Sequence, residues 1–170
     1  IYCGAIVEFV DIDVGTYNMS IEVLREKLVK AKKENKLPKL VVPVHFSGQS
    51  CEMKDIWELS KEYGFKVIED ASHALGGEYK NKKVGCCEYS HITVFSFHPV
   101  KMITTGEGGA ITTNDKDLDE KIKLLRSHGI IRNKEKFKNN NDGDWYYEQQ
   151  GLGFNYRLSD IQAALGISQL

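Results

Sequence analysis

The fold of this chain is decided by a short stretch, which reads HITVFSFHPVK over residues 91–101. Its first part is rich in apolar and β-branched residues, and this composition predicts a buried strand from His91 to Phe95. A single lysine, Lys101, follows the strand and precedes a glycine-rich turn, which reads TTGEGG over residues 104–109. The stretch therefore predicts a strand that carries a polar loop at its carboxyl end.

Further short apolar runs lie on both sides of this stretch. We expect strands over residues 5–12, 40–46, 65–68 and 109–113. The run over residues 40–46 contains Pro43, which indicates a strand end or an irregularity. Residues 76–85 resemble a small hairpin that turns at Asn81-Lys82.

Helical patterns separate the strands. Apolar residues keep helical spacing over residues 20–35, 53–63 and 115–127. Gly64 is placed to end the second helix, and Leu118, Ile122 and Leu125 form the expected buried stripe of the third. Ser159 starts a capping box for a terminal helix, whereas residues 132–151 show no regular pattern. The fold class is therefore α/β, with a mainly parallel central sheet flanked by helices.

Polar groups follow several of these strands. Asp70 ends one strand, the loop from Ser96 to Lys101 follows the next, and His45-Phe46 ends a third. Ligands of parallel α/β sheets bind beyond the carboxyl ends of the strands. We therefore expect a binding site at this edge of the sheet.

The composition limits the kinds of partner. The chain has 170 residues, 41% of them hydrophobic and 28% charged, with a formal net charge of -1. This length suits one domain with a real core, and the near-neutral charge argues against nucleic acid as a partner. We find no run of the roughly 20 apolar residues that a membrane span needs. Neither a disulfide framework nor a zinc site matches the cysteine spacing, which favours reduced thiols in a cytoplasmic protein.

Lys101 and Asp70 together suggest one cofactor. Pyridoxal 5'-phosphate (PLP) is held through a Schiff base to a lysine, and a carboxylate pairs with its protonated ring nitrogen. His73 is a candidate for a contact to the cofactor ring, or for a bond to a backbone carbonyl. Ser96 and the turn at residues 104–106 offer hydroxyl and N–H groups of the kind that bind phosphate. The alternatives are a surface lysine at position 101 and a helix cap at position 70.

A metal site is disfavoured. The five histidines could join Asp70 or Glu69, but no His-x-x-x-His pair and no Cys-x-x-Cys pair occurs in the sequence. A dinucleotide or nucleoside-triphosphate site is disfavoured too, because the glycine-rich fingerprints of such sites are missing. We therefore expect no metal ligands.

Four blocks in fixed order carry a family resemblance. They read EDASHA over residues 69–74, FSFHPVK over 95–101, GEGG over 106–109 and GFNYR over 153–157. In these blocks the chain resembles the DegT/DnrJ/EryC1/StrS sugar aminotransferases. The resemblance implies the large domain of a fold-type I PLP-dependent transferase. It makes Lys101 the catalytic lysine, with Asp70, His73 and Ser96 binding the cofactor.

The resemblance also implies a partner subunit. Asn155 would reach toward the cofactor phosphate of a neighbouring protomer, and Arg157 toward its substrate, so that a homodimer has two shared sites. The implied reaction moves an amino group from L-glutamate to a nucleotide-linked keto sugar. The resemblance is nearest to members that act on a UDP-4-keto-6-deoxy-N-acetylhexosamine in the synthesis of pseudaminic acid, a bacterial surface sugar.

On this resemblance, residues 1–170 are the central part of the PLP-binding large domain. The chain opens without methionine and stops inside a helical pattern, so both ends look like cuts through a larger protein. The family's leading segment and its C-terminal small domain are then absent, and we expect little transaminase activity from these residues alone.

Two rival functions remain open. One is a pyridoxamine-phosphate-dependent sugar dehydratase of the same family, although such members typically carry histidine in place of the lysine. The other is a noncatalytic homologue that binds PLP, or a partner, without turnover. A half-reaction with glutamate separates the second rival from an active enzyme.

Overall fold

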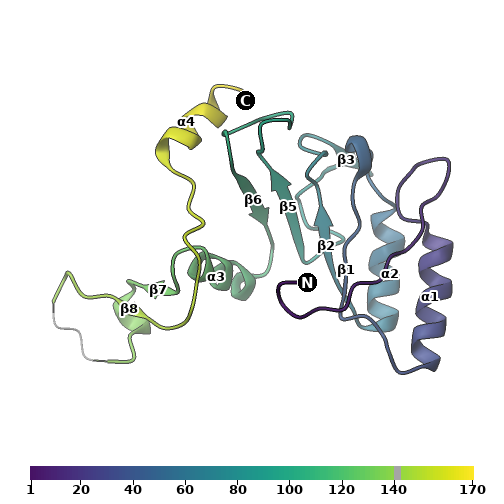
Figure 1. Cartoon of the computed structure of the whole chain (residues 1–170), viewed down its shortest axis with the longest axis horizontal. Coiled ribbons are helices and arrows are strands. Elements are labelled where there is room, and N and C mark those ends of the chain that lie inside the picture. The colour runs from purple at the N-terminus through teal and green to yellow at the C-terminus, as the bar shows by residue number, and fades with distance from the viewer. Residues whose placement is uncertain (140–142) are drawn as a thin grey trace.

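The centre of the molecule is a mostly parallel sheet. The computed structural model describes residues 1–139 and 143–170. Within them, four strands pair in the order β1-β2-β5-β6 (Figure 1). Their bounds are Leu40–Val41, Lys66–Asp70, Ile92–Ser96 and Gly109–Thr112. Strands β1, β2 and β5 run parallel, and β6 is antiparallel to β5. The predicted fold class is confirmed.

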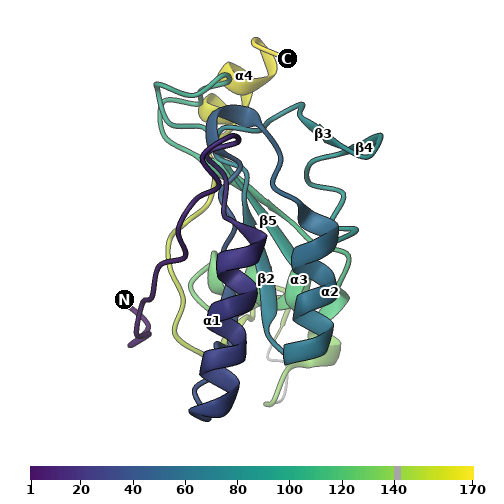
Figure 2. The same cartoon turned by 90° about the vertical axis from the view of Figure 1, so that its right-hand side faces the viewer.

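Two helices cover one face of this sheet. Helices α1 (Ile21–Lys33) and α2 (Met53–Tyr63) lie side by side (Figure 2). The Ser20 hydroxyl accepts a hydrogen bond from the Val23 N–H and so caps α1, and Gly64 ends α2 with a φ of 79°. The core that they form with β1 and β2 comprises Leu24, Leu28, Val41, Cys51, Met53, Ile56, Leu59, Phe65 and Val67.

The two faces of the sheet differ in burial. Register pairs Glu69 with Thr93 and Asp70 with Val94. Because side chains alternate along a strand, Val67, Glu69 and Thr93 share the buried face. Asp70 and Val94 share the opposite face, where both side chains are only partly buried. The predicted aspartate therefore lies on the more open face.

The predicted hairpin is present, but its turn lies one residue earlier. Strand β3 (Glu78–Tyr79) pairs with β4 (Lys82–Lys83), so the turn is Lys80-Asn81 rather than Asn81-Lys82. Both turn residues have positive φ values, 48° and 63°. Two positive φ values in a row match the twist of a two-residue hairpin, which explains the register.

Two strand predictions were wrong over part of their length. Residues 5–11 form no strand; Ile12 pairs only with Met19, through an isolated bridge. A run of apolar and β-branched residues becomes a strand only beside a second strand that pairs with its N–H and C=O groups. Among the described residues no strand lies beside residues 5–11, although the Asp11 carbonyl accepts from the Ser20 N–H at 3.0 Å. Of residues 40–46, Leu40–Val41 is a strand and Phe46–Gly48 is the 3-10 turn η1.

The helix predicted over residues 115–127 is present as α3 (Lys116–Leu125) and is capped by Asp115, but its predicted buried stripe was wrong. None of its residues is fully buried, and Leu125 is 38% exposed. The reason is that no described element packs closely over this face. After α3, β7 (Ile130–Ile131) pairs with β8 (Glu148–Gln149) around the 3-10 turn η2 (Lys134–Lys136). Residues 140–142 of the patternless stretch lie outside the described residues.

The C-terminal helix contacts the glycine-rich turn. Helix α4 (Asp160–Ile167) begins with the predicted capping box at Ser159. Gln169 pairs with both backbone groups of Thr104, and Gln162 Nε2 donates to the Glu107 carbonyl. The helix therefore lies beside the loop that carries Lys101 (Figure 1). Among the described residues no helix is long and apolar enough to cross a membrane.

Candidate active site

Asp70 is the last residue of β2, and its backbone is held from both sides. Its N–H donates to the Pro43 carbonyl at 2.9 Å, and its carbonyl accepts from the His45 N–H at 3.0 Å. The Oδ1 atom accepts from the Ser72 N–H at 3.0 Å, in a turn rather than at a helix start. No described residue bonds to Oδ2. The structure thus holds one free carboxylate oxygen at the open face.

Ser96 lies on the same face of the sheet as Asp70. It is the last residue of β5 and is two residues beyond Val94, the neighbour of Asp70 in the register. Among the described residues, its hydroxyl accepts only a long contact from the His98 N–H, at 3.4 Å. Because β2 and β5 are parallel, both side chains lie at the carboxyl edge where such sheets bind ligands.

Lys101 lies in the loop that follows β5, and its side chain is partly buried. Its N–H donates to the His98 carbonyl at 2.9 Å. The loop closes where the N–H of Thr105 donates to the Phe97 carbonyl at 3.0 Å. No hydrogen bond or ion pair joins its Nζ to another described residue. The lysine is therefore carried by a closed loop and keeps its amine available.

The turn at residues 104–106 does not fit the predicted phosphate cradle. The Thr104 hydroxyl donates to the Phe97 carbonyl and accepts from the Gly106 N–H. The Thr105 hydroxyl donates to the Glu107 carbonyl at 2.8 Å. These groups already have partners inside the loop, so they stabilise its shape. Ser96 remains the phosphate candidate.

His73 follows Asp70 by three residues and is exposed. Its ring lies edge-on to the Phe46 ring, with 6.4 Å between the centroids. No bond from this ring to a backbone carbonyl occurs among the described residues. The structure therefore leaves the imidazole accessible at the same edge as Asp70.

Asn155 and Arg157 lie apart from these residues. Asn155 forms an isolated bridge with Ser127, just after α3. The Asn155 Oδ1 atom accepts from Arg157 at two atoms, at 3.0 Å from Nε and 2.7 Å from Nη2. Among the described residues no hydrogen bond or ion pair joins Asn155 or Arg157 to Asp70, Ser96 or Lys101.

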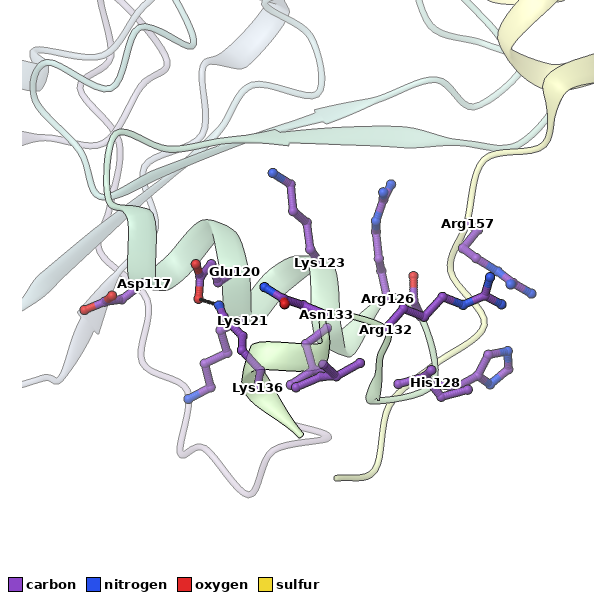
Figure 3. A pocket seen from close by; sticks show the side chains of 14 residues that line it. Asp117, Glu120, Lys121, Lys123, Arg126, His128, Arg132, Asn133, Lys136 and Arg157 are labelled. Atoms are coloured by element: carbon purple, nitrogen blue, oxygen red, sulfur yellow. Dashed lines mark hydrogen bonds and ion pairs between the residues drawn. The ribbon is translucent and has the colours of Figure 1, made fainter. Parts of the chain in front are cut away.

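A hollow of about 840 Å³ lies beside α3, and Asp70 and Lys101 are not among the residues that line it (Figure 3). Of the predicted site residues only Arg157 lines it. Most of its charged side chains are basic, and two of them are paired with carboxylates: Lys123 with Asp119 at 2.7 Å and Lys136 with Glu120 at 2.5 Å. The hollow is therefore a partly neutralised basic surface, separate from the lysine and the aspartate.

Sequence reasoning missed a buried polar cluster next to Asp70. Glu69 Oε2 lies 2.8 Å from His45 Nε2, and Oε1 accepts from the Thr93 hydroxyl at 2.8 Å and from the Ser90 hydroxyl. Burial opposes ionisation of Glu69, but these hydrogen bonds outweigh it and lower the pKa below its usual value. A glutamate at a buried position of an apolar strand was the available signal, because such a charge must be paired.

The cysteines and histidines form no metal site among residues 1–139 and 143–170. All four cysteines are free, as predicted. Burial raises the pKa of the Cys51 thiol to about 12, so this thiol stays protonated.

A lysine loop and an aspartate thus share one sheet edge, and the match to known proteins identifies the family. The family model for the DegT/DnrJ/EryC1/StrS aminotransferases matches residues 1–170. The chain belongs to this family. Its resemblance to sugar aminotransferases, first visible in four sequence blocks, is thereby confirmed. Members of the family depend on PLP.

Individual relatives carry different substrate names. A UDP-4-amino-4,6-dideoxy-N-acetyl-beta-L-altrosamine transaminase of Campylobacter jejuni is 47% identical over 98% of this chain and 40% of its own length. A GDP-perosamine synthase of Caulobacter vibrioides is 41% identical over 99% of this chain and 40% of its own. The structure of Helicobacter pylori PseC, an aminotransferase of pseudaminic acid biosynthesis, matches with a TM-score of 0.83. Its identity is 40%, over 99% of this chain and 40% of that one. The chain thus spans about two fifths of their length.

Proposed function

We propose that the protein is a PLP-dependent aminotransferase that moves an amino group from L-glutamate to a nucleotide-linked keto sugar. The observation that carries this proposal is the shared edge of Asp70, Ser96 and the Lys101 loop, in a chain of a sugar aminotransferase family. In the experiments below, the term full-length enzyme means a polypeptide of the relatives' length that includes these 170 residues.

The residues at this edge fit PLP. The free Oδ2 of Asp70 is a suitable acceptor for a protonated ring nitrogen, and the weakly bonded Ser96 hydroxyl suits a phosphate oxygen. The Lys101 amine has no ionic partner among the described residues. Each part of the cofactor thus has a group of matching chemistry on this face, with His73 available beside the ring.

When bound, PLP supplies an aldehyde that exchanges with amines and a ring that takes up the electron pair of the breaking Cα–H bond. Asp70 would hold a proton at the ring nitrogen, because a carboxylate favours the protonated form of a neighbouring base. Lys101 Nζ would anchor the cofactor, then accept the proton from the substrate Cα and pass it to the C4′ carbon of the cofactor. Acid–base work by one placed group contributes about 10²–10⁴-fold in rate.

We further propose UDP-4-keto-6-deoxy-N-acetylhexosamine, a precursor of pseudaminic acid, as the acceptor. Support comes from the names of the Campylobacter and Helicobacter relatives, while the GDP-perosamine synthase shows that the family accepts other nucleotide sugars. The presence of lysine at position 101 argues against the dehydratase alternative.

The proposal includes an assembly and a location. Asn155 and Arg157 would serve the site of a second protomer in a homodimer, in line with their pairing with each other and with Ser127 rather than with Lys101. We infer that residues 1–170 form the central part of the PLP-binding large domain and that the protein is cytoplasmic, in line with its free cysteines.

The test is a pair of half-reactions with the full-length enzyme. Glutamate should convert bound PLP to its amine form and release one equivalent of 2-oxoglutarate. A panel of UDP- and GDP-linked keto sugars should then restore the aldehyde form, with the UDP-4-keto-6-deoxy-N-acetylhexosamine fastest. Absence of the first half-reaction would refute an aminotransferase and favour the noncatalytic alternative.

A further inference from the structure

The buried cluster behind Asp70 consists of His45, Glu69, Ser90 and Thr93, and we call it the His45–Glu69 cluster. All four side chains are buried, with exposed fractions of 0%, 6%, 5% and 0%. The Glu69 carboxylate receives the His45 ring on one oxygen and both hydroxyls on the other. Every oxygen of the buried carboxylate thus has a partner, and the assigned functions use none of these groups.

The protonation of the His45 ring follows from its second contact. The Cys51 N–H donates to His45 Nδ1 at 3.1 Å, so Nδ1 is an acceptor and carries no proton. The ring proton therefore sits on Nε2, where it is donated to Glu69. Because Cys51 lies six residues beyond His45, the ring closes a short loop and connects it to β2.

This loop also holds the backbone of Asp70. His45 donates its own N–H to the Asp70 carbonyl, and Pro43 accepts from the Asp70 N–H. Residues 43–51 are irregular apart from η1, and Val44 meets Asp70 only through an isolated bridge. The ring–carboxylate bond is thus the side-chain link that fixes this irregular segment against the end of the strand.

Stability alone does not account for such a cluster. A buried carboxylate costs free energy that apolar residues of similar volume avoid, so a strand that only needs packing has no use for Glu69. Buried hydrogen-bonded pairs are suited instead to holding one geometry. The neighbour whose geometry matters is Asp70, which projects to the opposite face of the same strand.

We propose that His45 and Glu69 are positioning residues, whose buried bond holds Asp70 in register with the ring nitrogen of PLP. The inference rests on the proposed function, because it takes Asp70 as the partner of that nitrogen. His45 and Glu69 act from behind the strand and do not touch the cofactor.

The test compares His45→Asn with Ser90→Ala in the full-length enzyme. Asparagine keeps an acceptor for the Cys51 N–H but is too short to reach Glu69. Ser90→Ala also removes one bond to the Glu69 carboxylate, yet leaves the link to residues 43–51 intact. Two quantities are measured: the dissociation constant of PLP, and the ¹⁵N chemical shift of the pyridine nitrogen in labelled PLP, which reports its protonation.

His45→Asn should weaken PLP binding by about 10- to 100-fold, the size of effect known from removing outer hydrogen-bond partners of metal ligands. It should also move the ¹⁵N signal toward the unprotonated form. Ser90→Ala should lower the melting temperature while leaving both quantities as in the wild type. Glu69→Gln should keep the dissociation constant of PLP within about threefold of the wild type. Its amide oxygen still accepts from His45, and its NH₂ group can donate to the two hydroxyls.

Two results overturn the inference. In the first, His45→Asn lowers the melting temperature but leaves the PLP affinity and the ¹⁵N shift unchanged. In the second, Ser90→Ala changes the PLP affinity and the ¹⁵N shift as strongly as His45→Asn does. If His45→Asn does not fold, Glu69→Met removes the same bond at similar volume and carries the same expectations.

The variant Asp70→Asn separates the proposed site from the positioning role of His45 and Glu69. If it leaves the ¹⁵N shift unchanged, the proposed site itself fails; if it moves the shift and His45→Asn does not, only this inference fails.

Discussion

The two ends of the molecule differ in how far their apolar side chains are buried (Figure 1 shows the two ends). At the end built from α1, α2, β1 and β2, large side chains such as Leu28 and Ile56 are 1% and 0% exposed. At the other end, α3 has no buried residue, and Ile161 of α4 is 83% exposed. The first end completes its own core, whereas the second presents apolar surface.

The difference shows which functions each end can serve alone. Asp70 and Lys101 are positioned by the first end and by the loop after β5, so their placement follows from this chain. Asn155 and Arg157 lie on the exposed end, where they pair with each other. The function proposed for them needs a covering surface, which the proposed second protomer would provide.

Replacing Lys101 should have the largest effect, and it should lower turnover without lowering the melting temperature. In the full-length enzyme Lys101→Ala should lower transaminase turnover by about 10²–10⁴-fold or more, because the proton carrier and anchor are lost. Its melting temperature should stay within about 2 °C of the wild type, since the side chain is only partly buried. Lys83→Ala, at an exposed ion pair, is the matched control and should leave turnover unchanged. Wild-type turnover from Lys101→Ala would contradict the site.

Truncating one isoleucine at each end tests the contrast in burial. In the 170-residue chain Ile56→Ala should lower the free energy of unfolding by about 2–5 kcal/mol, because a filled core position becomes a cavity. Ile161→Ala should change it by less than about 0.5 kcal/mol, as exposed substitutions do. Urea titrations measure both. In the full-length dimer the effect of Ile161→Ala should grow; equal effects of the two variants in the short chain would show that the two ends do not differ in burial.

Mixing two inactive enzymes tests whether the exposed end serves a neighbouring site. Lys101→Ala and Arg157→Ala homodimers should each be inactive, since each lacks one group of both sites. After random exchange of subunits, half of the dimers are mixed and have one intact site, so about a quarter of wild-type turnover should return. If no activity returns although mixed dimers form, Arg157 acts in its own protomer; an active Arg157→Ala homodimer would show that Arg157 is not needed.

Lowering the pH should reduce the free energy of unfolding, because Glu69 at the buried end becomes protonated. The pKa of this carboxyl is lowered in the folded protein, so its contribution to stability is present above about pH 4.5 and is lost as pH falls through the folded pKa. Glu69→Gln binds no proton, and its unfolding free energy should therefore fall less steeply over that acidic range. Parallel urea titrations between about pH 7 and pH 3 give both curves. Curves of equal slope would show that Glu69 does not titrate on unfolding.

Local signals predicted the first end of the molecule well. Spacing and the Gly64 cap located α2 at the residues where it occurs, and the strand before Lys101 was predicted within one residue at each end. These elements are determined by their own caps and by contacts with close neighbours. The order of strands and helices then sufficed to place Asp70 and Ser96 at one edge.

Other features depended on contacts that no local pattern reveals. Residues 5–12 are apolar like a strand but lack a partner strand among the described residues, and the apolar stripe of α3 lacks a surface to cover it. The bond between His45 and Glu69 joins residues 24 positions apart, so only the fold could bring it to light. The same holds for the use of the Thr104 and Thr105 hydroxyls within their own loop.

The proposed function depends above all on Lys101 being the residue to which PLP attaches. Reduction of the PLP-loaded full-length enzyme with borohydride, followed by peptide mass mapping, identifies that residue without any assumption about the substrate. We expect one pyridoxyl group per protomer, on the peptide that contains Lys101. A pyridoxyl group on a different lysine, or no stable label, would contradict the assignment.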